Sequence, residues 1–493
     1  MIFLPPFLFC AGFGFLILTD ILKRTKVPHR TLLILTLSTP VGFGMCSILL
    51  FWSYLVFPKE GKLIALFLCY LTAVLRLLSI LRQNDFYPDA RLQIKKLFER
   101  RPFVPSVTPR HIPVAKILSM LLTLGLLGIL TYFFFRYLNL FLSSVVWNAY
   151  GGWDARFIWH IKAKFYFRAP EVWAAMFSPL MDWTHPDYPL MLPGAIAWGW
   201  NWVGKEILIW PHMVNLVFSL STVFLVLWYL GSYTTWKQAL VAGSFLLSIE
   251  YFLYWGLALY ADVPLCFLIT AATLMLIAGL KHREADLFFL SGFIAGFAAW
   301  TKNEGYLFAV WLLATCVITL LMFRELSFPD RKRFCLKFLG GLALPIFTYF
   351  FQKWFLSWRG DYWDARSPSE IVSLLLNGAL TAQIATLYFR YMFVLTSWNS
   401  LWVFFCAALL YRIILSRGKN PYHFGWIMAV IVVLLNLGYF LILHISPHNV
   451  IWQIGTSLDR LLLHSSVLAI VFTVETFSLD RIIKRTAVHP GTD

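Results

Sequence analysis

The chain has 493 residues, of which 60% are hydrophobic and 13% charged, and its mean hydropathy is +0.72. Such a composition excludes a soluble globular domain and indicates a protein that lies in a membrane. The net charge of +17 is explained by basic loops between membrane spans, so we expect no nucleic-acid partner. The 7 cysteines form no CxxC pair, which argues against a disulfide framework or a cysteine zinc site.

Apolar segments recur along the whole chain, and they are continuous rather than alternating in polarity. Since a spanning helix needs ~20 mostly apolar residues, the sequence predicts an all-α polytopic membrane protein with about thirteen transmembrane helices. The first segment has no basic residues before it and reads as a retained span. The expected spans lie near residues 1–20, 31–57, 63–82, 117–147, 209–230, 239–257, 263–280, 287–301, 305–323, 336–355, 400–414, 424–444 and 461–478.

Basic residues set the expected orientation, because loops rich in Lys and Arg stay in the cytoplasm. An outer N-terminus places the basic segments 21–30, 82–116, 324–337 and the tail after residue 479 inside. Two non-spanning segments rich in Trp, Tyr and charge, 151–208 and 356–399, then lie outside. We expect them to cover a site at the outer membrane surface.

The polar segment 82–116 is the best internal boundary of the chain. It predicts an N-terminal extension over residues 1–110, made of three membrane helices and a basic cytoplasmic loop. The main membrane domain then covers residues 111–480, and residues 481–493 form a cytoplasmic tail.

The outer segment begins with a basic pattern on an expected helix. Four basic residues recur every four positions beside aromatic and aliphatic ones, namely Arg156, His160, Lys164 and Arg168. This spacing predicts an interfacial helix that either holds lipid phosphates or merely extends its basic side chains to the headgroups. The segment His185–Pro189 and the apolar residues up to Val203 predict a second interfacial helix.

Five short strings follow one another along the chain: Trp153-Asp154, HPDYP at 185–189, YADVP at 260–264, WTKNEG at 300–305 and SLDRLLLH at 457–464. In this order the chain resembles the superfamily C (GT-C) membrane glycosyltransferases. It is similar to the bacterial polyprenyl-phosphate-sugar enzymes related to protein O-mannosyltransferases and to the aminoarabinose transferases of lipid A. The resemblance covers roughly residues 117–480, and the three spans before residue 110 depart from the usual arrangement.

This resemblance implies a glycosyltransferase in the bacterial cytoplasmic (inner) membrane, with the active site of its catalytic domain facing outward. Its donor is a polyprenyl-phosphate sugar, and its acceptor is a lipid, a glycan or a protein. Such a transfer needs a carboxylate that accepts the hydroxyl proton and cations that stabilise the departing phosphate.

Two acids match the catalytic positions of the family. By resemblance Asp154 is the base of an inverting transfer, and Asp262 is a second acid of the active site. Either acid could instead cap the helix that begins beside it, which aspartate does well.

The resemblance and the basic character of four residues indicate binding of the donor phosphate, namely Lys302, Arg460, Arg156 and Lys164. Asp459 could instead be the partner of Arg460. Possible substrate-binding residues are Trp153, His185, Asp187 and Glu304. A divalent metal held by His185, Asp187 and Asp154 is also possible, although their spacing fits no established metal motif.

Two other functions share this composition. A transporter or flippase of lipid-linked saccharides would carry broken helices and paired charges near the bilayer midplane. A glycan ligase or polymerase acting on pyrophosphate-linked glycans would rely on Arg and His more than on a leading Asp.

Overall fold

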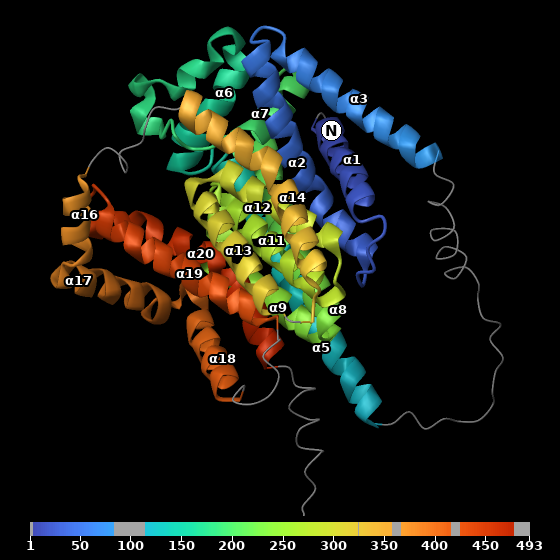
Figure 1. Cartoon of the computed structure of the whole chain (residues 1–493), viewed down its shortest axis with the longest axis vertical. Helices are drawn as coiled ribbons and strands as arrows, with labels where there is room; N and C mark the ends of the chain where they lie inside the picture. Colours follow the sequence, from blue (N-terminus) through green and yellow to red (C-terminus); the bar gives the residue numbers. More distant parts are fainter. Residues whose placement is uncertain (1–2, 83–113, 324, 357–365, 416–423, 478–493) are drawn as a thin grey trace, which may run out of the picture.

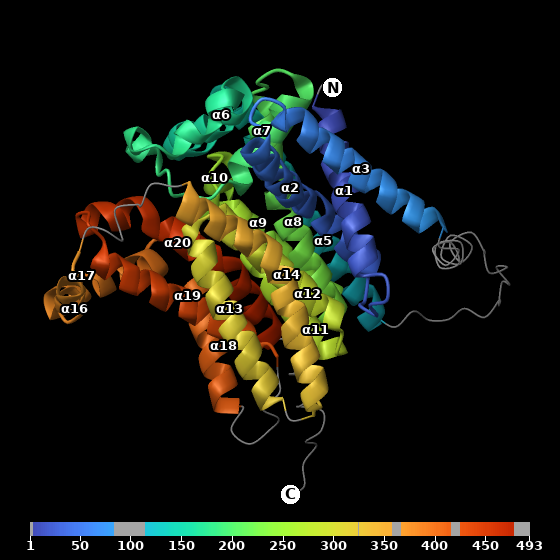
Figure 2. The ribbon, with the colours of Figure 1, turned by 45° about the horizontal axis from the view of Figure 1, so that its top comes forward.

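The computed structural model describes residues 3–82, 114–323, 325–356, 366–415 and 424–477. Over these residues the regular secondary structure is helical, without a strand. The helices form one bundle, with α3 extending from one side and α16 and α17 from the other (Figures 1 and 2).

The first part of the chain forms long helices, which are followed by short ones. The first four long ones are α1 (Leu4–Ile21), α2 (Arg30–Val56), α3 (Gly61–Arg82) and α5 (Val114–Trp147). The outer segment then forms η2 (Ala155–His160), α6 (Ile161–Arg168), η3 (Pro170–Phe177), η4 (Pro179–Thr184) and α7 (Met191–Val203).

The C-terminal half supplies most of the bundle. Its first part is α8 (Ile209–Tyr233), α9 (Trp236–Ser248), α10 (Glu250–Leu257), α11 (Asp262–His282), α12 (Ala285–Thr301), α13 (Asn303–Met322) and α14 (Phe328–Phe355). Its second part is α16 (Pro368–Leu375), α17 (Gly378–Phe389), η5 (Arg390–Val394), η6 (Thr396–Trp398), α18 (Leu401–Leu415), α19 (Trp426–Ile445) and α20 (Val450–Thr476).

Among the described residues, 9 helices are long and apolar enough to cross a membrane, or up to 11 if each bent pair is one span. The chain is therefore a multi-pass α-helical membrane protein, but the expected thirteen spans are not confirmed. Three of them are shorter apolar helices, Gly61–Leu75, Ala285–Thr301 and Leu401–Ile414. The expected span 239–257 is broken into α9 and α10, which meet at 62°.

The helix α11 is the centre of the bundle, since its side chains from Asp262 to Leu280 are all buried. Next to it, α12 packs closely on α14. A Cβ atom on Gly292 of α12 would lie 2.0 Å from the carbonyl oxygen of Phe338, so only glycine permits this approach. This packing fixes the end of α12, where Lys302 follows.

The N-terminal helices pack into the same bundle. Ser47 of α2 donates a hydrogen bond to the carbonyl oxygen of Leu190 and accepts one from the Trp300 indole. The helix α7 is not the interfacial helix that we expected, because its residues from Met191 to Asn201 are buried. The reason is that α2, α6 and α8 pack around it.

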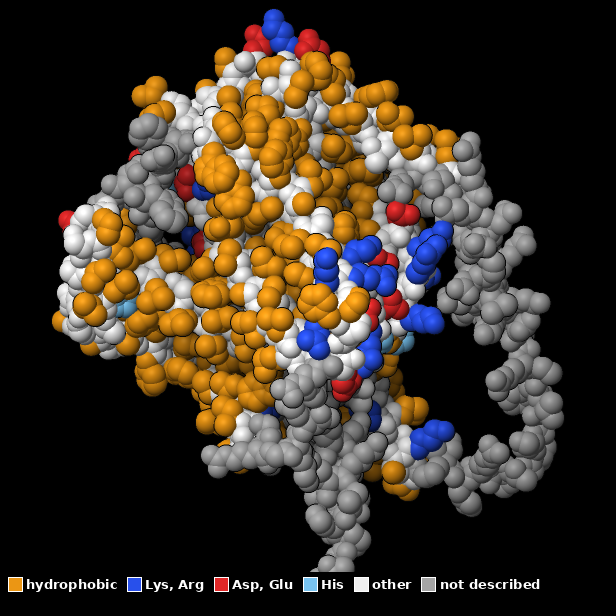
Figure 3. Space-filling view, viewed as in Figure 1, with side chains coloured by type: hydrophobic (Ala, Val, Ile, Leu, Met, Phe, Trp, Pro, Cys, Tyr) orange, Lys and Arg blue, Asp and Glu red, His pale blue; other side chains and the backbone are white. Residues whose placement is uncertain are grey.

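The two ends of the bundle differ in charge. At one end, the backbone N–H of Lys26 donates to Glu284, and Arg283 pairs with Glu325 at 2.6 Å. The expected inner segments 21–30 and 324–337 thus meet the turn after α11 at the same end. Figure 3 shows Lys and Arg side chains gathered in this area, on a face that is otherwise largely hydrophobic.

Candidate functional site

A cluster of charged side chains lies at the opposite end of α11, where the helix begins. Its central residue is Arg460 of α20, which bridges two carboxylates. The guanidinium Nη2 lies 2.7 Å from Oδ2 of Asp154, and Nε lies 3.0 Å from Oδ2 of Asp262. Three residues from the beginning, the middle and the end of the sequence resemblance therefore meet in one ion-pair chain.

The other oxygen of Asp262 is also occupied. Lys302 Nζ and His464 Nε2 each lie 3.0 Å from Oδ1 of Asp262. The ammonium of Lys302 also contacts Oε1 of Glu304 at 2.9 Å. Burial alone would lower the pKa of Lys302, but the carboxylates of Asp262 and Glu304 raise it above its ordinary value, so Lys302 stays charged.

The imidazole of His464 extends this cluster into the bundle. Its Nδ1 lies 3.1 Å from the hydroxyl oxygen of Tyr439, and both side chains are buried. His464 thus joins α19, α20 and the first residue of α11 through one chain of hydrogen bonds.

The backbone around Asp154 explains its position. Gly151 has a φ of +70°, and the N–H of Gly152 donates to the carbonyl oxygen of Ala258 at 2.9 Å. A Cβ atom on Gly152 would lie 2.8 Å from the Tyr260 ring, so glycine lets the loop approach this ring. The N–H of Asp154 then donates to the Tyr260 hydroxyl at 3.2 Å.

The capping alternative does not hold for either acid. Asp154 stands at the N-cap of η2 without a side-chain capping bond, and Asp262 lies inside the first turn of α11. Nor is Asp459 the partner of the Arg460 guanidinium. Its carboxylate accepts the backbone N–H of Arg460 at 2.9 Å and the indole N–H of Trp255 at 3.2 Å.

Aromatic rings hold the guanidinium of Arg460 from the side. Its Cζ lies 4.7 Å from the centroid of the Tyr260 ring and 5.4 Å from that of Trp255. Such cation–π contacts add ~0.5–2 kcal/mol each, depending on desolvation. The rings thus orient Arg460 in addition to its two carboxylate partners.

The HPDYP segment forms a second polar cluster beside the first. Asp187 accepts hydrogen bonds from Lys353 Nζ at 3.0 Å and from the Asn303 amide at 2.7 Å. Burial would raise the pKa of Asp187, but Lys353 and Lys162 hold it below its ordinary value. Because Asn303 lies between Lys302 and Glu304 in the chain, the two clusters share the junction of α12 and α13.

Lys162 of α6 anchors the same segment. It is buried and donates hydrogen bonds to the carbonyl oxygens of His185 at 2.6 Å and Tyr188 at 3.3 Å. Burial lowers its pKa to about 7. The rings of His185 and Trp159 both stack against Tyr188, with centroids 5.0 and 5.5 Å away.

The expected basic stripe does not form on one face. Residues 155–160 adopt a π-helix, whose wider turn breaks the spacing of four before α6 begins. His160 is buried, and burial together with Lys164 lowers its pKa to about 3, so it is uncharged at neutral pH. At the far end, Arg168 pairs with Glu206.

Three expected site residues form no ion pair or side-chain hydrogen bond with the cluster in the part of the chain that the structure describes. Trp153 is 54% exposed and packs against Phe157. Arg156 is exposed and donates to the carbonyl oxygen of Gly151, while Lys164 is half-buried. The structure thus brings together Asp154, Asp262, Lys302, Glu304 and Arg460, with His185 and Asp187 in the neighbouring cluster.

The donor groups do not fit a metal ion. Within the part of the chain that the structure describes, no three His, Cys, Asp or Glu side chains lie together as a metal site requires. Asp187, which we considered as a ligand beside Asp154, is bound to Lys353 and Asn303 instead. No step of the chemistry below is therefore assigned to a metal.

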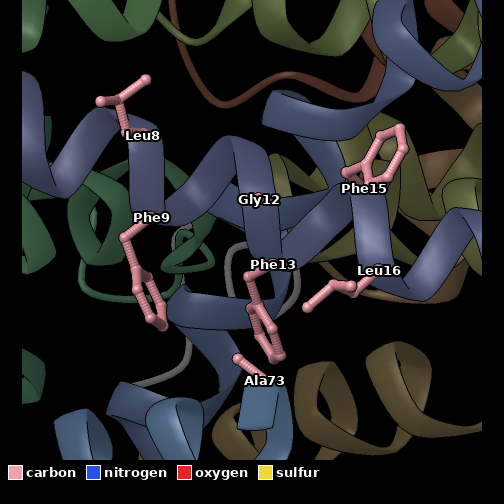
Figure 4. Close-up of a pocket in the computed structure, with 7 residues that line it drawn as sticks. All are labelled: Leu8, Phe9, Gly12, Phe13, Phe15, Leu16 and Ala73. Carbon is pink, nitrogen blue, oxygen red and sulfur yellow. The ribbon is translucent and has the colours of Figure 1, made fainter. Parts of the chain in front are cut away.

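A groove of about 330 Å³ lies elsewhere, between α1 and α3 (Figure 4). Its lining is apolar and consists of Leu8, Phe9, Gly12, Phe13, Phe15, Leu16 and Ala73. Without a charged or hydrogen-bonding side chain, this groove can hold an apolar chain but offers no chemistry.

Sequence reasoning missed several members of the two clusters. His464 and Tyr260 lie within the strings SLDRLLLH and YADVP, so their polarity beside the chosen acids was a usable signal. Lys353 ends an apolar span, where a lysine usually reaches the headgroups, and Lys162 lies between two basic residues. Their roles follow from contacts that no sequence spacing reveals.

Comparisons with protein-family models, with curated proteins and with solved structures found no match to this chain. The resemblance to GT-C enzymes therefore depends on the motif residues alone.

Proposed function

We propose that this chain is a glycosyltransferase that moves a sugar from a polyprenyl-phosphate donor to an acceptor at the outer face of the membrane. The observation that carries the proposal is the bridge that Arg460 makes between Asp154 and Asp262. It combines a carboxylate that can accept a proton with a cation that can bind phosphate, which are the groups that this transfer needs.

In this proposal Asp154 is the base. It takes the proton of the acceptor hydroxyl, whose oxygen attacks the anomeric carbon of the donor as the bond to the phosphate oxygen breaks, with inversion. Arg460 stabilises the negative charge on the departing phosphate, because its planar guanidinium binds phosphate oxygens in pairs. Asp154 and Arg460 are partly exposed, with 16% and 13% of their side chains accessible.

The buried members of the cluster have a different role in the proposal. Asp262 and Lys302 are 0% and 3% exposed, so they position Arg460 rather than contact the substrate. Lys302 adds positive charge near the phosphate without leaving its two carboxylates. Substrate hydroxyls meet Glu304, whose side chain is 17% exposed.

The location of the cluster supports an outward-facing active site. It lies at the start of α11, whereas the basic segments 21–30 and 324–337 meet near the end of that helix. Basic loops remain in the cytoplasm, so the opposite end faces outward in a bacterial cytoplasmic membrane. A lipid-linked donor is the activated sugar that fits this side, with a lipid, glycan or protein as the acceptor.

A transporter of lipid-linked saccharides is the second candidate, and two observations favour it. The pairs α9–α10 and α16–α17 are each bent by 62°. The cluster also brings charges of four helices together inside the bundle, and buried charge networks mark transport pathways. The ligase or polymerase reading has less support, since an aspartate bridge and not a set of Arg and His dominates the site.

Transfer of radiolabelled sugar from a set of polyprenyl-phosphate sugars, in membranes with matched protein levels, tests the proposal. We expect wild-type protein to transfer the label and Asp154→Asn to lose at least about 100-fold in rate, as is usual for loss of a general base. Asp182→Asn is the matched control, because Asp182 is an exposed acid of the same outer segment.

Equal transfer by wild type and Asp154→Asn would remove Asp154 from the chemistry. No transfer from any donor, together with movement of a labelled lipid-linked saccharide across proteoliposomes, would replace the enzyme by the transporter.

A further inference from the structure

We infer that Arg460 is held by Asp154 before the donor binds, and that the phosphate group of a polyprenyl-phosphate lipid displaces this carboxylate from the guanidinium. The inference deepens the proposed function and rests on it for the identity of the ligand. It assigns to one ion pair two tasks, since the same displacement opens the phosphate site and frees the base.

The two halves of the Arg460 guanidinium face different surroundings. Nε contacts Asp262, whose side chain is 0% exposed and is bound on its other oxygen by Lys302 and His464. Nη2 contacts Asp154, whose side chain is 16% exposed and which stands at the N-cap of η2. The first contact is therefore permanent, whereas the second can be exchanged for another anion.

The surroundings of Arg460 keep it in place during such an exchange. The rings of Tyr260 and Trp255 flank the guanidinium, and the bond to Asp262 fixes its Nε. The Asp154 loop is held through the backbone, by Gly152 on Ala258 and by the Asp154 N–H on Tyr260. The Asp154 carboxylate can thus turn away while its backbone stays next to the site.

Charge explains why the incoming ligand must be an anion. While the Asp154 carboxylate occupies Nη2, a neutral hydroxyl competes poorly, because a charge-assisted bond is about twice as strong as a neutral one. A phosphate oxygen carries the charge and the geometry to replace a carboxylate oxygen on a guanidinium. The carboxylate oxygen that Arg460 releases is then able to accept the proton of the acceptor hydroxyl.

The test is binding of a polyprenyl monophosphate without sugar, measured by calorimetry on the purified full chain in detergent. Removal of the competing carboxylate in Asp154→Asn should tighten binding about 10-fold, which corresponds to about 1.4 kcal/mol. Asp182→Asn removes the same charge from the same outer segment and should leave the affinity unchanged. Unchanged or weaker binding by Asp154→Asn would overturn the inference.

A double-variant cycle separates exchange from simple repulsion between Asp154 and the phosphate. If the carboxylate competes for Arg460, Asp154→Asn has no effect in an Arg460→Gln background, whereas repulsion persists in that background. If the glutamine variant fails to fold, Arg460→Lys replaces it in the cycle. Lysine keeps a positive charge for Asp262 but has one nitrogen atom, whereas arginine contacts the two carboxylates through Nε and Nη2. A 10-fold gain that survives both replacements would contradict the exchange.

The outcomes for the inference and for the proposed function are distinct. Sugar transfer by wild type combined with no gain in phosphate affinity in Asp154→Asn would disprove the exchange and leave the enzyme standing. A gain in affinity without transfer from any donor would support the exchange and disprove the glycosyltransferase. Absence of phosphate-lipid binding in every variant would overturn the inference.

Discussion

The helices α11 and α20 are joined by ion pairs at both of their ends, and the two junctions are built differently. Under the proposed orientation, the outer junction lies at the start of α11, where Asp262 is bound by Arg460, Lys302 and His464. The inner junction lies at the end of α11, where Lys281 is 3.7 Å from Glu475, and Glu475 accepts the Tyr229 hydroxyl at 3.4 Å.

The comparison shows how a ligand-binding site differs from an ion pair that only joins two helices. The inner junction joins one acid to one lysine, whose ammonium also lies 4.3 Å from the centre of the Tyr233 ring. The outer junction adds Asp154, a partly exposed acid at the N-cap of η2, which shares the cation Arg460 with the buried Asp262. An ion pair that can change its partner is able to bind a ligand, whereas a closed pair only holds two helices together.

The largest effect is expected from Asp262→Asn. This change leaves Arg460 and Lys302 buried without their common carboxylate, and removal of one partner of a buried pair costs ~3–5 kcal/mol. We expect a lower unfolding temperature in detergent, followed by tryptophan fluorescence, and loss of sugar transfer.

Asp154→Asn is the control for this comparison, since its partner Arg460 keeps Asp262. Its unfolding temperature should fall by much less than that of Asp262→Asn. If both variants unfold at the same temperature, the two carboxylates do not have separate roles, in which Asp154 contacts the substrate and Asp262 positions Arg460.

The inner junction predicts a compensating pair of replacements. Lys281→Met alone leaves Glu475 buried beside Tyr229 without its lysine partner, and we expect a loss of ~3 kcal/mol. The double variant Lys281→Met with Glu475→Leu should recover most of this stability, because apolar side chains of similar volume can replace a buried ion pair.

Sugar transfer supplies the functional readout for the same variants. The inner double variant should transfer at nearly the wild-type rate, whereas Asp154→Asn with Arg460→Gln should not. Loss of transfer in a stable inner double variant would show that the two junctions act together and would break the comparison.

Much of the bundle could be predicted from hydropathy, because each span must satisfy its own backbone in lipid. Composition alone could not tell an interfacial helix from α7, which is apolar because it packs inside the protein. The expected span 239–257 ran through the break between α9 and α10, because the single charged residue at that break, Glu250, does not by itself indicate a bend. Where a helix bends and which of its faces are buried depend on packing against neighbouring helices.

The candidate site, too, could be predicted only in part from the sequence. The contacts of Arg460 with Asp154 and Asp262 agree with residues chosen from short strings, although their roles stay predictions. The stripe through His160 was wrong, because a π-helical turn rotated that side chain into the protein. The roles of His464 and Lys162 could be found only from the structure, since a polar residue in an apolar segment is usually exposed or has no function.

The next prediction concerns the loop that carries Asp154. Gly152→Ala places a Cβ atom 2.8 Å from the Tyr260 ring, so the loop must shift away from Arg460. We expect about a 10-fold loss of transfer, equivalent to about 1.4 kcal/mol, with little change in unfolding temperature. Gly128→Ala is the control, because nothing lies within 4 Å of its added Cβ.

The change with the smallest effect at neutral pH is at His160, and its effect appears only in acid. Burial holds the pKa of folded His160 at about 3, below the value of ~6.5 for an unfolded histidine. As pH falls from 6.5 to 3, the unfolded chain binds this proton first, so folded-state stability decreases by at most ~1.4 kcal/mol per pH unit. His160→Leu should flatten the fall of unfolding temperature over this range, whereas replacement of the exposed His448 should not. Because the Asp154–Arg460 pair does not depend on His160, His160→Leu should leave sugar transfer at neutral pH unchanged. Loss of transfer in this variant would show that His160 belongs to the active site, contrary to its place in the structure.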